Sequence, residues 1–470
     1  MKNGDNMDGI LESYDVVIIG GGIGGIMTAY KLSKSNGKLK ILLLEKGNDL
    51  ADRKCPLITV NKGKGGCLKC PNCAIMSGMA GAGAFSDGKY VIGTEYGGWL
   101  TDFLPQDTVL SYIKQADDVL VEFGATTKVF HPNDELKREC LQYDLHLKQT
   151  DLKHLGTDNN YFTMLKLIEY LKTKITILTR AKVFDVDKNT NTVLFNYQNT
   201  EVSVVGKHIV FAVGRAGSQD FRGWCDKNGV ECNNNQVDLG VRVELPSIIW
   251  EKFSKQIYEP KVWYRTKAYG DVVRMFCFNE RGHVVMENTD SVLTINGHSY
   301  AQEDKKTKNS NFALLSTSTF TQPFKAPIEY ARYVASLANK ISGGSVLVQR
   351  FGDLVKGRRT TPERLKESTT IPTLDAVPGD LALCMPKRQL DNIVETIYAL
   401  DKIAPGTANM DTLLYGIECK YYATRPETND FEINGCKQIY AIGDGGGFTR
   451  SLSHAAAHGL YIADKILNTK

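Results

Sequence analysis

The segment YDVVIIGGGIGGIMTAYKL, residues 14–32, constrains the fold more than any other part of the chain. Val16–Ile19 predict a buried strand, and the glycines after it predict a tight turn that opens a helix. Gly20, Gly22 and Gly25 fit the spacing G-x-G-x-x-G. In this setting the first glycine allows the turn, the second lets backbone approach a pyrophosphate, and the third lets the helix pack on the strand. The free N–H groups of the helix N-terminus then face the phosphates.

A second strand completes this unit. KLKILLLEKG, residues 38–47, is mostly apolar up to Glu45, which stands twenty-five residues after Gly20. A carboxylate at this place accepts hydrogen bonds from ribose hydroxyls and favours an unphosphorylated ribose. A glycine triad alone is weak evidence, but strand, triad, helix, strand and carboxylate in this order predict dinucleotide binding.

Two later segments predict further contacts with the same cofactor. IYAIGDGGGFTR, residues 439–450, reads as a short buried strand followed by a turn that contains Asp444. Asp444 suits a carboxylate that holds a ribitol hydroxyl, while the helix from about Leu452 stabilises negative charge near a reduced flavin ring. A structural aspartate in a glycine-rich turn is the alternative. KHIVFAVGRAG, residues 207–217, predicts a strand that leads to Gly214, where backbone passes close to the cofactor.

Together these three segments resemble the FAD-binding pattern of the glutathione-reductase-like flavoprotein superfamily. The chain holds one full dinucleotide fingerprint, so a second, resident NAD(P) domain is not expected. Five further motifs occur in order: GAGAFSDGK (81–89), VDLGVRVELP (237–246), NGHSY (296–300), VQRFGDLVKGRRTT (348–361) and GDGGGFTR (443–450). With them the chain resembles, over nearly its whole length, the FAD-utilising dehydrogenases, or NAD(P)/FAD-dependent oxidoreductases. This resemblance implies FAD and an oxidoreductase activity without naming a substrate.

The position of these segments at both ends of the chain and in its middle predicts a discontinuous fold of the α/β class. We expect a Rossmann-like FAD-binding domain from residues 1–221 and 371–470, with a helical insertion at about 105–172. Residues 222–370 contain alternating, β-like runs and one amphipathic helix within 326–341. They predict an inserted α+β substrate or cap domain built on an antiparallel sheet.

Flavin chemistry needs a substrate held against N5 and one proton managed by the protein. The catalytic candidates are His454 in the last helix, His298 in the NGHSY motif, and Arg450, which suits a cofactor or substrate anion. His454 stands where the resembling family often carries Gln, and for both histidines a capping or packing role is the ordinary alternative. The candidate cofactor-binding residues are Gly20, Gly22, Gly25, Glu45, Gly81, Gly83, Ser86, Asp87, Lys89, Gly214, Gly443, Asp444, Gly446 and Gly447.

Four cysteines lie close together in the sequence: Cys67, Cys70 and Cys73 are separated by two residues each, and Cys55 lies upstream. The spacing resembles three adjacent ligands of a 4Fe–4S cluster with a displaced fourth. Zinc held by four cysteines, redox-active thiols that exchange electrons beside the flavin, and no metal at all are the alternatives. The departure from the usual paired spacing of zinc ligands and the closeness to the flavin favour iron–sulfur.

Bulk properties exclude several function classes. A net charge of +4 gives no support for nucleic-acid binding, and no apolar run approaches the ~18–20 residues that cross a bilayer. Eleven cysteines without a secretion signal are typical of reduced thiols in the cytoplasm.

We therefore expect a cytoplasmic FAD-dependent oxidoreductase, a dehydrogenase or reductase, that transfers hydride between a small organic substrate and flavin N5. Its electrons would be exchanged through NAD(P)H, a redox partner protein or a cluster at the cysteines. A flavin-dependent monooxygenase is one alternative. A redox sensor or electron carrier without a small-molecule substrate is the other.

Overall fold

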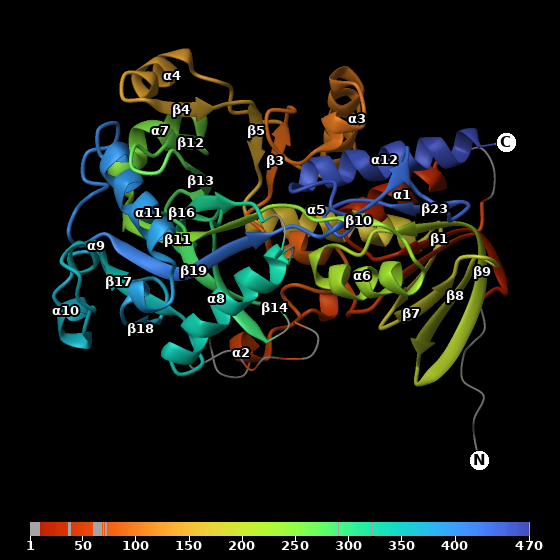
Figure 1. Cartoon of the computed structure of the whole chain (residues 1–470). Coiled ribbons are helices and arrows are strands. Elements are labelled where there is room, and N and C mark those ends of the chain that lie inside the picture. Colours follow the sequence, from red (N-terminus) through yellow and green to blue (C-terminus); the bar gives the residue numbers. More distant parts are fainter. Residues whose placement is uncertain are drawn as a thin grey trace.

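Two large β-sheets organise the part of the chain that the structure describes. The structure is a computed structural model, and it describes residues 10–35, 39–59, 68, 70, 73–289, 291–320, 323–324 and 326–469. Within these ranges one sheet has nine strands and the other eight, with helices packed around both. Figure 1 shows the nine-stranded sheet at the right and the eight-stranded sheet at the left.

The nine-stranded sheet has a parallel centre made from segments that are far apart in sequence. Strand β1 (Ser13–Ile19) pairs in parallel with β2 (Ile41–Glu45) on one side and with β9 (Thr200–Phe211) on the other. Strand β23 (Ile439–Ala441) pairs in parallel with β9. Val16–Ile19 are buried, as expected of a parallel strand covered on both faces. This arrangement confirms the predicted α/β, Rossmann-like fold class.

Helix α1 (Ile23–Ser33) and helix α12 (Leu452–Asn468) join the two ends of the chain by close packing. The Thr28 hydroxyl donates to the carbonyl oxygens of Gly24 at 2.9 Å and Gly459 at 3.0 Å. A Cβ atom at Gly459 would lie 2.2 Å from the Gly24 oxygen, so only glycine fits there. The small residues of α12 therefore hold it against the helix that follows the first strand, as Figure 1 shows.

The second sheet is largely antiparallel, as the sequence predicts. Its strands follow in the order β18 (Val377–Pro378), β17 (Leu347–Arg350), β19 (Leu413–Tyr421), β11 (Val237–Pro246), β16 (Asn309–Ser318), β13 (Val272–Asn279), β12 (Lys261–Arg265) and β4 (Leu145–Lys148). The long strands are β11, β16 and β19. Arg242 on β11 and Glu418 on β19 form a fully buried ion pair with Nε and Oε2 2.7 Å apart. Arg242 is thus a salt-bridge residue within the sheet, and its partner comes from the neighbouring strand.

The stretch predicted to be helical, residues 105–172, is helical only in part. Helices α3 (Gln106–Glu122), α4 (Asp134–Leu141) and α5 (Thr157–Lys172) lie within it. Between α4 and α5, however, β4 (Leu145–Lys148) pairs with β12 in the eight-stranded sheet, and β5 (Asp151–His154) pairs with β3 (Lys89–Ile92). Each of these strands has four residues, too few for a periodic pattern to be read, and their partners are distant in sequence. The predicted domain boundaries stay a prediction.

The remaining elements connect or cover the two sheets. Within the described ranges, every helix is too short or too polar to cross a bilayer. The other helices are α2 (Pro56–Thr59), α6 (Ser218–Lys227), α7 (Glu251–Ile257), α8 (Pro327–Ile341), α9 (Phe351–Val355), α10 (Pro362–Lys366) and α11 (Lys387–Leu400). The other strands are β3 (Lys89–Ile92), β6 (Thr176–Thr179), β7 (Lys182–Asp187), β8 (Thr192–Tyr197), β10 (Cys232–Asn233), β12 (Lys261–Arg265), β13 (Val272–Asn279), β14 (His283–Thr289), β15 (Val292–His298), β17 (Leu347–Arg350), β18 (Val377–Pro378), β20 (Arg425–Pro426), β21 (Thr428–Asn429) and β22 (Glu432–Ile433).

Candidate active site

A cavity of about 1020 Å³ is lined by residues of both large sheets. On the side of the nine-stranded sheet its wall contains the turns that follow β1, β9 and β23. These turns stand at the carboxyl ends of parallel strands, where open α/β sheets bind their ligands. The volume exceeds the range of roughly 300–1,000 Å³ that is usual for one drug-sized ligand.

The glycine turn after β1 has the geometry that a bound dinucleotide requires. Gly20 has φ +112°, and a Cβ atom there would lie 2.4 Å from the Ala212 oxygen. A Cβ atom at Gly25 would lie 2.1 Å from the Gly20 oxygen, whereas one at Gly22 would meet nothing within 4 Å. Gly22 thus borders open space on the cavity wall, at the N-terminus of α1, which has no side-chain cap. The residues present fit a pyrophosphate at this place.

Glu45 closes this turn from the end of β2. Its side chain is buried, and its Oε2 and Oε1 accept hydrogen bonds from the N–H groups of Gly21 and Gly47, each at 2.8 Å. Carboxylate oxygens each accept more than one hydrogen bond, so acceptor capacity remains on the cavity side. Glu45 therefore fixes the glycine turn and also presents oxygen atoms to the cavity.

Arg53, which the sequence analysis did not single out, holds the next part of the wall. Its buried guanidinium donates to four backbone carbonyls of the loop before β3, and it lies 4.8 Å from the Phe85 ring. Burial lowers the pKa of Arg53 to about 10, which still leaves it charged at neutral pH. The accepting carbonyls and their distances are Ala74 (2.9 Å), Ile75 (2.7 Å), Met79 (2.7 Å) and Gly81 (2.7 Å).

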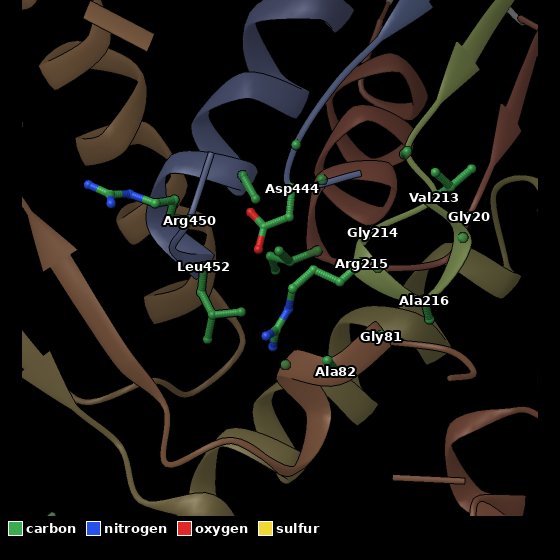
Figure 2. A pocket seen from close by; sticks show the side chains of 18 of the residues that line it. Gly20, Gly81, Ala82, Val213, Gly214, Arg215, Ala216, Asp444, Arg450 and Leu452 are labelled. Carbon is green, nitrogen blue, oxygen red and sulfur yellow. The ribbon is translucent and has the colours of Figure 1, made fainter. Parts of the chain in front are cut away.

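Two opposite charges, Arg215 and Asp444, line the cavity from the turns after β9 and β23. Figure 2 shows Asp444 entering the cavity from one turn and Arg215 extending from the other toward the Gly81–Ala82 backbone. The Thr449 hydroxyl donates to Asp444 Oδ1 at 2.6 Å, and burial raises the pKa of Asp444. Burial alone would lower the pKa of Arg215, but the nearby Glu287 and Asp444 raise it. Arg215 follows Gly214 directly, yet a single arginine after a glycine carries no recognisable signal.

The structure brings most of the predicted cofactor-binding residues onto the cavity wall. Gly25, Gly446 and Gly447 are the exceptions among them. Gly25 serves helix packing, and a Cβ atom at Gly447 would lie 2.6 Å from the Ala423 oxygen, so this glycine packs against the chain before β20. The residues that line the cavity are Gly20, Gly22, Glu45, Gly81, Gly83, Ser86, Asp87, Lys89, Gly214, Gly443 and Asp444.

Burial lowers the pKa and so favours the neutral form of three histidines near the site, His298, His454 and His458. His454 donates from Nε2 to the Gly93 oxygen at 3.1 Å, and burial lowers its pKa to about 4. Burial also lowers the pKa of His298 to about 4. Neither side chain lines the cavity, so neither position supports the predicted catalytic role. His458 accepts the Gly443 N–H at 3.2 Å through Nδ1 and thereby supports the turn that carries Asp444.

The far end of the cavity is basic. Lys148 on β4 and Lys261 on β12 are direct partners in the antiparallel register, and both line the cavity with Arg274 on β13. Like charges directly opposite each other destabilise a sheet. Burial, together with the cations Arg274 and Arg450, lowers the pKa of Lys148. Burial also lowers the pKa of Lys261, aided by the charges of Lys89 and Arg450.

Arg450 completes this basic end and keeps its charge available. Its guanidinium lies 4.7 Å from the Trp99 ring and donates to the Tyr422 hydroxyl at 3.5 Å. Within the residues that the structure describes, Arg450 forms no ion pair, whereas Arg274 is paired with the buried Asp238. Figure 2 shows Arg450 pointing away from Arg215, on the other side of Leu452.

Lys89 and Lys261 share one carboxylate but differ in how firmly they are held. Lys89 Nζ lies 2.7 Å from Asp87 Oδ2 and 3.6 Å from Glu259 Oε1, and it also donates to the Phe278 carbonyl. Lys261 Nζ lies 3.6 Å from the same Glu259 oxygen and 4.0 Å from the centre of the Tyr96 ring. The carboxylates raise the pKa of Lys89 despite its burial, so Lys89 is the fixed cation and Lys261 the more readily deprotonated amine.

The predicted metal ligands are only partly within the described chain. Cys67 lies outside the described residues, and Cys55 does not line either cavity. Across the ranges given above, no group of three or more His, Cys, Asp or Glu side chains is placed to hold a metal ion. Cys70 and Cys73 line a second, smaller cavity.

Two sequence families match the chain at the two parts of this site. The family described as FAD dependent oxidoreductase matches residues 15–54, which include the glycine turn, Glu45 and Arg53. The family described as FAD-dependent protein, C-terminal domain-like, matches residues 236–421, which include most of the eight-stranded sheet. Both matches are to families of FAD-dependent proteins, and they support an FAD-dependent oxidoreductase. The predicted cofactor, FAD, and the predicted enzyme class are thereby confirmed.

This FAD-dependent oxidoreductase is similar to proteins of several organisms. An uncharacterised protein of Clostridium beijerinckii is 27% identical over 473 residues, which cover 96% of this chain and 80% of that one. Mitochondrial L-2-hydroxyglutarate dehydrogenase of Dictyostelium discoideum is 58% identical over 38 residues, 8% of each protein. The solved glycine oxidase of Bacillus cereus has 12% identity and a TM-score of 0.43, and the alignment covers 97% of this chain and 96% of that one.

Proposed function

We propose that this FAD-dependent oxidoreductase transfers hydride between its cofactor and a small carboxylate that bears a hydroxyl or amino group on the adjacent carbon. The observation that carries the proposal is the excess of cations at the basic end of the cavity, where Lys89 and Lys261 share Glu259. Lys148 and Lys261 stand directly opposite each other on the neighbouring strands β4 and β12. Arg450 has no ion-pair partner in the described chain. A bound carboxylate would offset the repulsion among these cations and accept charge-assisted hydrogen bonds from them.

The residues at one end of the cavity would bind the cofactor, and those at the other end would bind the substrate. The backbone of the glycine turns, Glu45 and Asp444 would hold FAD, which when bound supplies a hydride acceptor or donor. Arg450 and Lys148 would bind the substrate carboxylate and so orient the carbon next to it. The cavity reaches well beyond the glycine turns, to β4, β12 and β13, and this extent favours a small-molecule substrate over a redox sensor without one.

Lys261 is the proposed proton acceptor. When hydride leaves a carbon that carries a hydroxyl or an amine, the proton of that O–H or N–H must leave as well. Lys261 lines the cavity, and its lowered pKa increases the fraction of neutral amine that can take this proton at Nζ. The centres of the Tyr96 and Phe276 rings lie 4.0 Å and 5.0 Å from Nζ, and the rings attract the amine in its charged form.

The experiment is anaerobic mixing of the FAD-loaded enzyme with matched pairs of compounds. Each 2-hydroxy or 2-amino carboxylate is compared with its uncharged amide, and loss of the absorbance of oxidised flavin is followed. We expect the carboxylates to reduce the flavin and the amides to fail. Equal reaction of both members of each pair would remove the basis of the proposal. If reduced enzyme and oxygen yield hydroxylated product, the activity is that of a monooxygenase instead.

The route by which electrons reach or leave the flavin is a separate part of the proposal. NAD(P)H as a transient donor and a redox partner protein are the two candidates, since the chain holds one dinucleotide fingerprint, already assigned to FAD. Stopped-flow addition of NADH or NADPH to the oxidised enzyme distinguishes them. Rapid flavin reduction by either nucleotide supports the first candidate.

A further inference from the structure

A strained turn lies directly before strand β12, at the basic end of the large cavity. Tyr258, which follows helix α7, has φ +60° and ψ −57°, and the Glu259 N–H donates to the Ile257 oxygen at 2.7 Å. These angles and this hydrogen bond define a γ-turn with positive φ, which is rare and strained. A bulky residue such as tyrosine is an outlier at positive φ. The surrounding structure must therefore hold Tyr258 in this conformation.

The Tyr258 side chain supplies the contacts that hold this turn. Its hydroxyl forms hydrogen bonds with His154 Nε2 at 2.8 Å and with Ser299 Oγ at 3.1 Å. Its ring stacks on the His154 ring with the two centres 4.0 Å apart, and its centre lies 5.1 Å from that of the Phe130 ring. These partners come from strand β5, the segment after β15 and the loop before α4. Strained backbone that is fixed by several distant segments occurs preferentially at functional sites.

The turn determines where the next carboxylate lies. Glu259 stands before Pro260, and a residue before proline favours an extended conformation. In an extended chain, side chains two residues apart point to the same side, so those of Glu259 and Lys261 project together. Both line the large cavity, and Oε1 of the buried Glu259 lies 3.6 Å from Nζ of Lys261 and 3.6 Å from Nζ of Lys89. The γ-turn thus places a buried carboxylate between two lysines.

The two lysines depend on Glu259 to different degrees. Lys89 has a second, closer carboxylate, Asp87, at 2.7 Å. For Lys261, Glu259 is the one carboxylate within ion-pair distance among the residues that the structure describes. The other titratable groups around Lys261 come from neighbouring strands and turns and are mostly cations: Lys89, Lys148, Arg450, Cys277 and Tyr96.

The balance of these charges decides how easily Lys261 loses its proton. Burial and the nearby cations favour the neutral amine, and together they lower the pKa of Lys261. The Glu259 carboxylate acts in the opposite direction, because it stabilises the ammonium form. Removing its charge would leave the amine neutral over a wider pH range and without its ion-pair partner on the cavity wall.

We propose that Glu259 is a positioning residue for Lys261, fixed by the γ-turn at Tyr258. It holds the Lys261 amine on the cavity wall, and it sets the pH above which that amine is free to accept a proton. When the substrate O–H or N–H passes its proton to Nζ, the new ammonium group lies beside a carboxylate that stabilises it. The catalytic meaning of this arrangement rests on the function proposed above, but the charge state of Lys261 is measurable without any substrate.

The test measures the reactivity of Lys261 in the full-length, FAD-loaded protein with no substrate present. Trace acetic anhydride acetylates amines only in their neutral form, and peptide mass spectrometry gives the extent of acetylation at Lys261 as the pH is raised. In Glu259→Gln an amide of the same shape replaces the carboxylate, so the midpoint should move to lower pH. At a pH below the wild-type midpoint, Lys261 should then react at least about tenfold faster than in the wild type. Glu259→Asp keeps the charge on a shorter side chain, and its midpoint should lie between the two.

Glu251→Gln is the matched control. Glu251 lies on α7 and pairs with Lys255, so this variant loses an exposed carboxylate that is engaged elsewhere. Its acetylation profile at Lys261 should match that of the wild type. An unchanged or raised midpoint in Glu259→Gln would overturn the proposal. Failure of Lys261 to react at any pH would do so as well, because a proton acceptor must be reachable from the cavity.

A second variant tests the turn, and the substrate experiment keeps the two proposals apart. Tyr258→Phe removes the hydroxyl that binds His154 and Ser299, so the midpoint should move in the same direction as in Glu259→Gln but by less. If the profiles shift as expected while no hydroxy or amino carboxylate reduces the flavin, the role of Glu259 stands and the proposed function is wrong. If carboxylates reduce the flavin while the profiles of Glu259→Gln and the wild type coincide, the proposed function stands and the role of Glu259 is wrong.

Discussion

The two ends of the large cavity are built in different ways. At the cofactor end, backbone turns at Gly20–Gly22, Gly214 and Gly443 form the wall, each placed by the strand immediately before it. At the basic end, the wall consists of side chains such as Lys148 and Lys261, brought together only by the pairing of distant strands. Changes at the cofactor end should therefore act on folding and FAD retention. Changes at the basic end should act on turnover with the cofactor in place.

The largest effect is expected at Gly20. Gly20→Val would force a β-branched residue to φ +112° and place its Cβ 2.4 Å from the Ala212 oxygen. A clash with backbone at a left-handed conformation costs on the order of 3 kcal/mol or more. We expect the variant to lose bound FAD and to unfold at a clearly lower temperature, measured by the flavin content after gel filtration and by thermal denaturation.

Gly22→Ala is the matched control within the same turn. Gly22 has φ −75°, and an added methyl meets no atom within 4 Å, so the protein should fold with unchanged thermal stability in the absence of cofactor. The methyl nevertheless projects from backbone that borders the cavity, and we expect the affinity for FAD to fall at least about tenfold, or ~1.4 kcal/mol. Wild-type affinity for FAD in Gly22→Ala would show that the pyrophosphate lies elsewhere.

At the basic end, the largest effect is expected at Lys261. Lys261→Met keeps an unbranched side chain against Tyr96 and Phe276 but removes the proton acceptor. General acid–base catalysis contributes typically 10²–10⁴-fold, so kcat should fall by about 10³-fold while FAD content stays unchanged. In the wild type, kcat should rise with pH through the lowered pKa of Lys261, because the neutral amine is the active form. The variant should lose this rise.

Lys261→Arg distinguishes proton transfer from simple attraction of the substrate. Arginine preserves the positive charge and the packing on Tyr96 but does not release its proton at any ordinary pH. If Lys261 accepts a proton, Lys261→Arg should be as slow as Lys261→Met. Retention of activity in Lys261→Arg would assign the residue to carboxylate binding only.

A smaller effect is expected at Arg450. Arg450→Ala removes a charge that has no ion-pair partner in the described chain and that lines the cavity. A hydrogen bond to a charged group contributes about 1.5–3 kcal/mol, so KM for a carboxylate substrate should rise by roughly 100-fold with a smaller change in kcat. Arg359→Ala, at an exposed position away from the cavity, is the control. An unchanged KM would place the carboxylate site away from Arg450.

The cofactor end could be predicted because its information is local. The order of strand, glycine turn, helix and Glu45 is contiguous in sequence, and Gly25 and Glu45 contact the glycine turn itself. The parallel sheet, the terminal helix and the loop at Gly81–Gly83 were all predicted from such contiguous patterns. The role of Arg53 was not predicted, because a single arginine in a sequence does not indicate that its side chain will donate to four backbone carbonyls.

The basic end could not be predicted, for a related reason. Lys148 lies on a four-residue strand within a stretch predicted to be helical, and its pairing with Lys261 is a property of the folded sheet. For His298 and His454, the sequence predicted a catalytic role that their positions do not support. Both lie in motifs that contain or adjoin predicted cofactor contacts, yet neither side chain lines the cavity. A sequence motif predicts the position of the backbone more reliably than it predicts the direction of a side chain.

The last expected effect concerns His458, whose burial makes the stability of the cofactor end depend on pH. Its Nδ1 accepts the Gly443 N–H, its ring packs 4.2 Å from the Phe431 ring, and burial lowers its pKa to about 3. The unfolded chain takes up a proton near pH 6.5 while the folded chain does not, so stability falls as the pH drops from 6.5 toward 3. At pH 5 this histidine should cost about 2 kcal/mol relative to pH 7.

His458→Gln tests this coupling, because a glutamine carbonyl oxygen still accepts a hydrogen bond but does not titrate. We expect the variant to be less stable than the wild type at pH 7 and to lose about 2 kcal/mol less on transfer to pH 5, measured by urea unfolding at saturating FAD. His154, His298 and His454 are also held neutral by burial, so the variant should keep the rest of the acid sensitivity. An identical pH dependence in the two proteins would show that His458 is protonated in the folded state, and the Gly443 turn would then need another acceptor for its N–H.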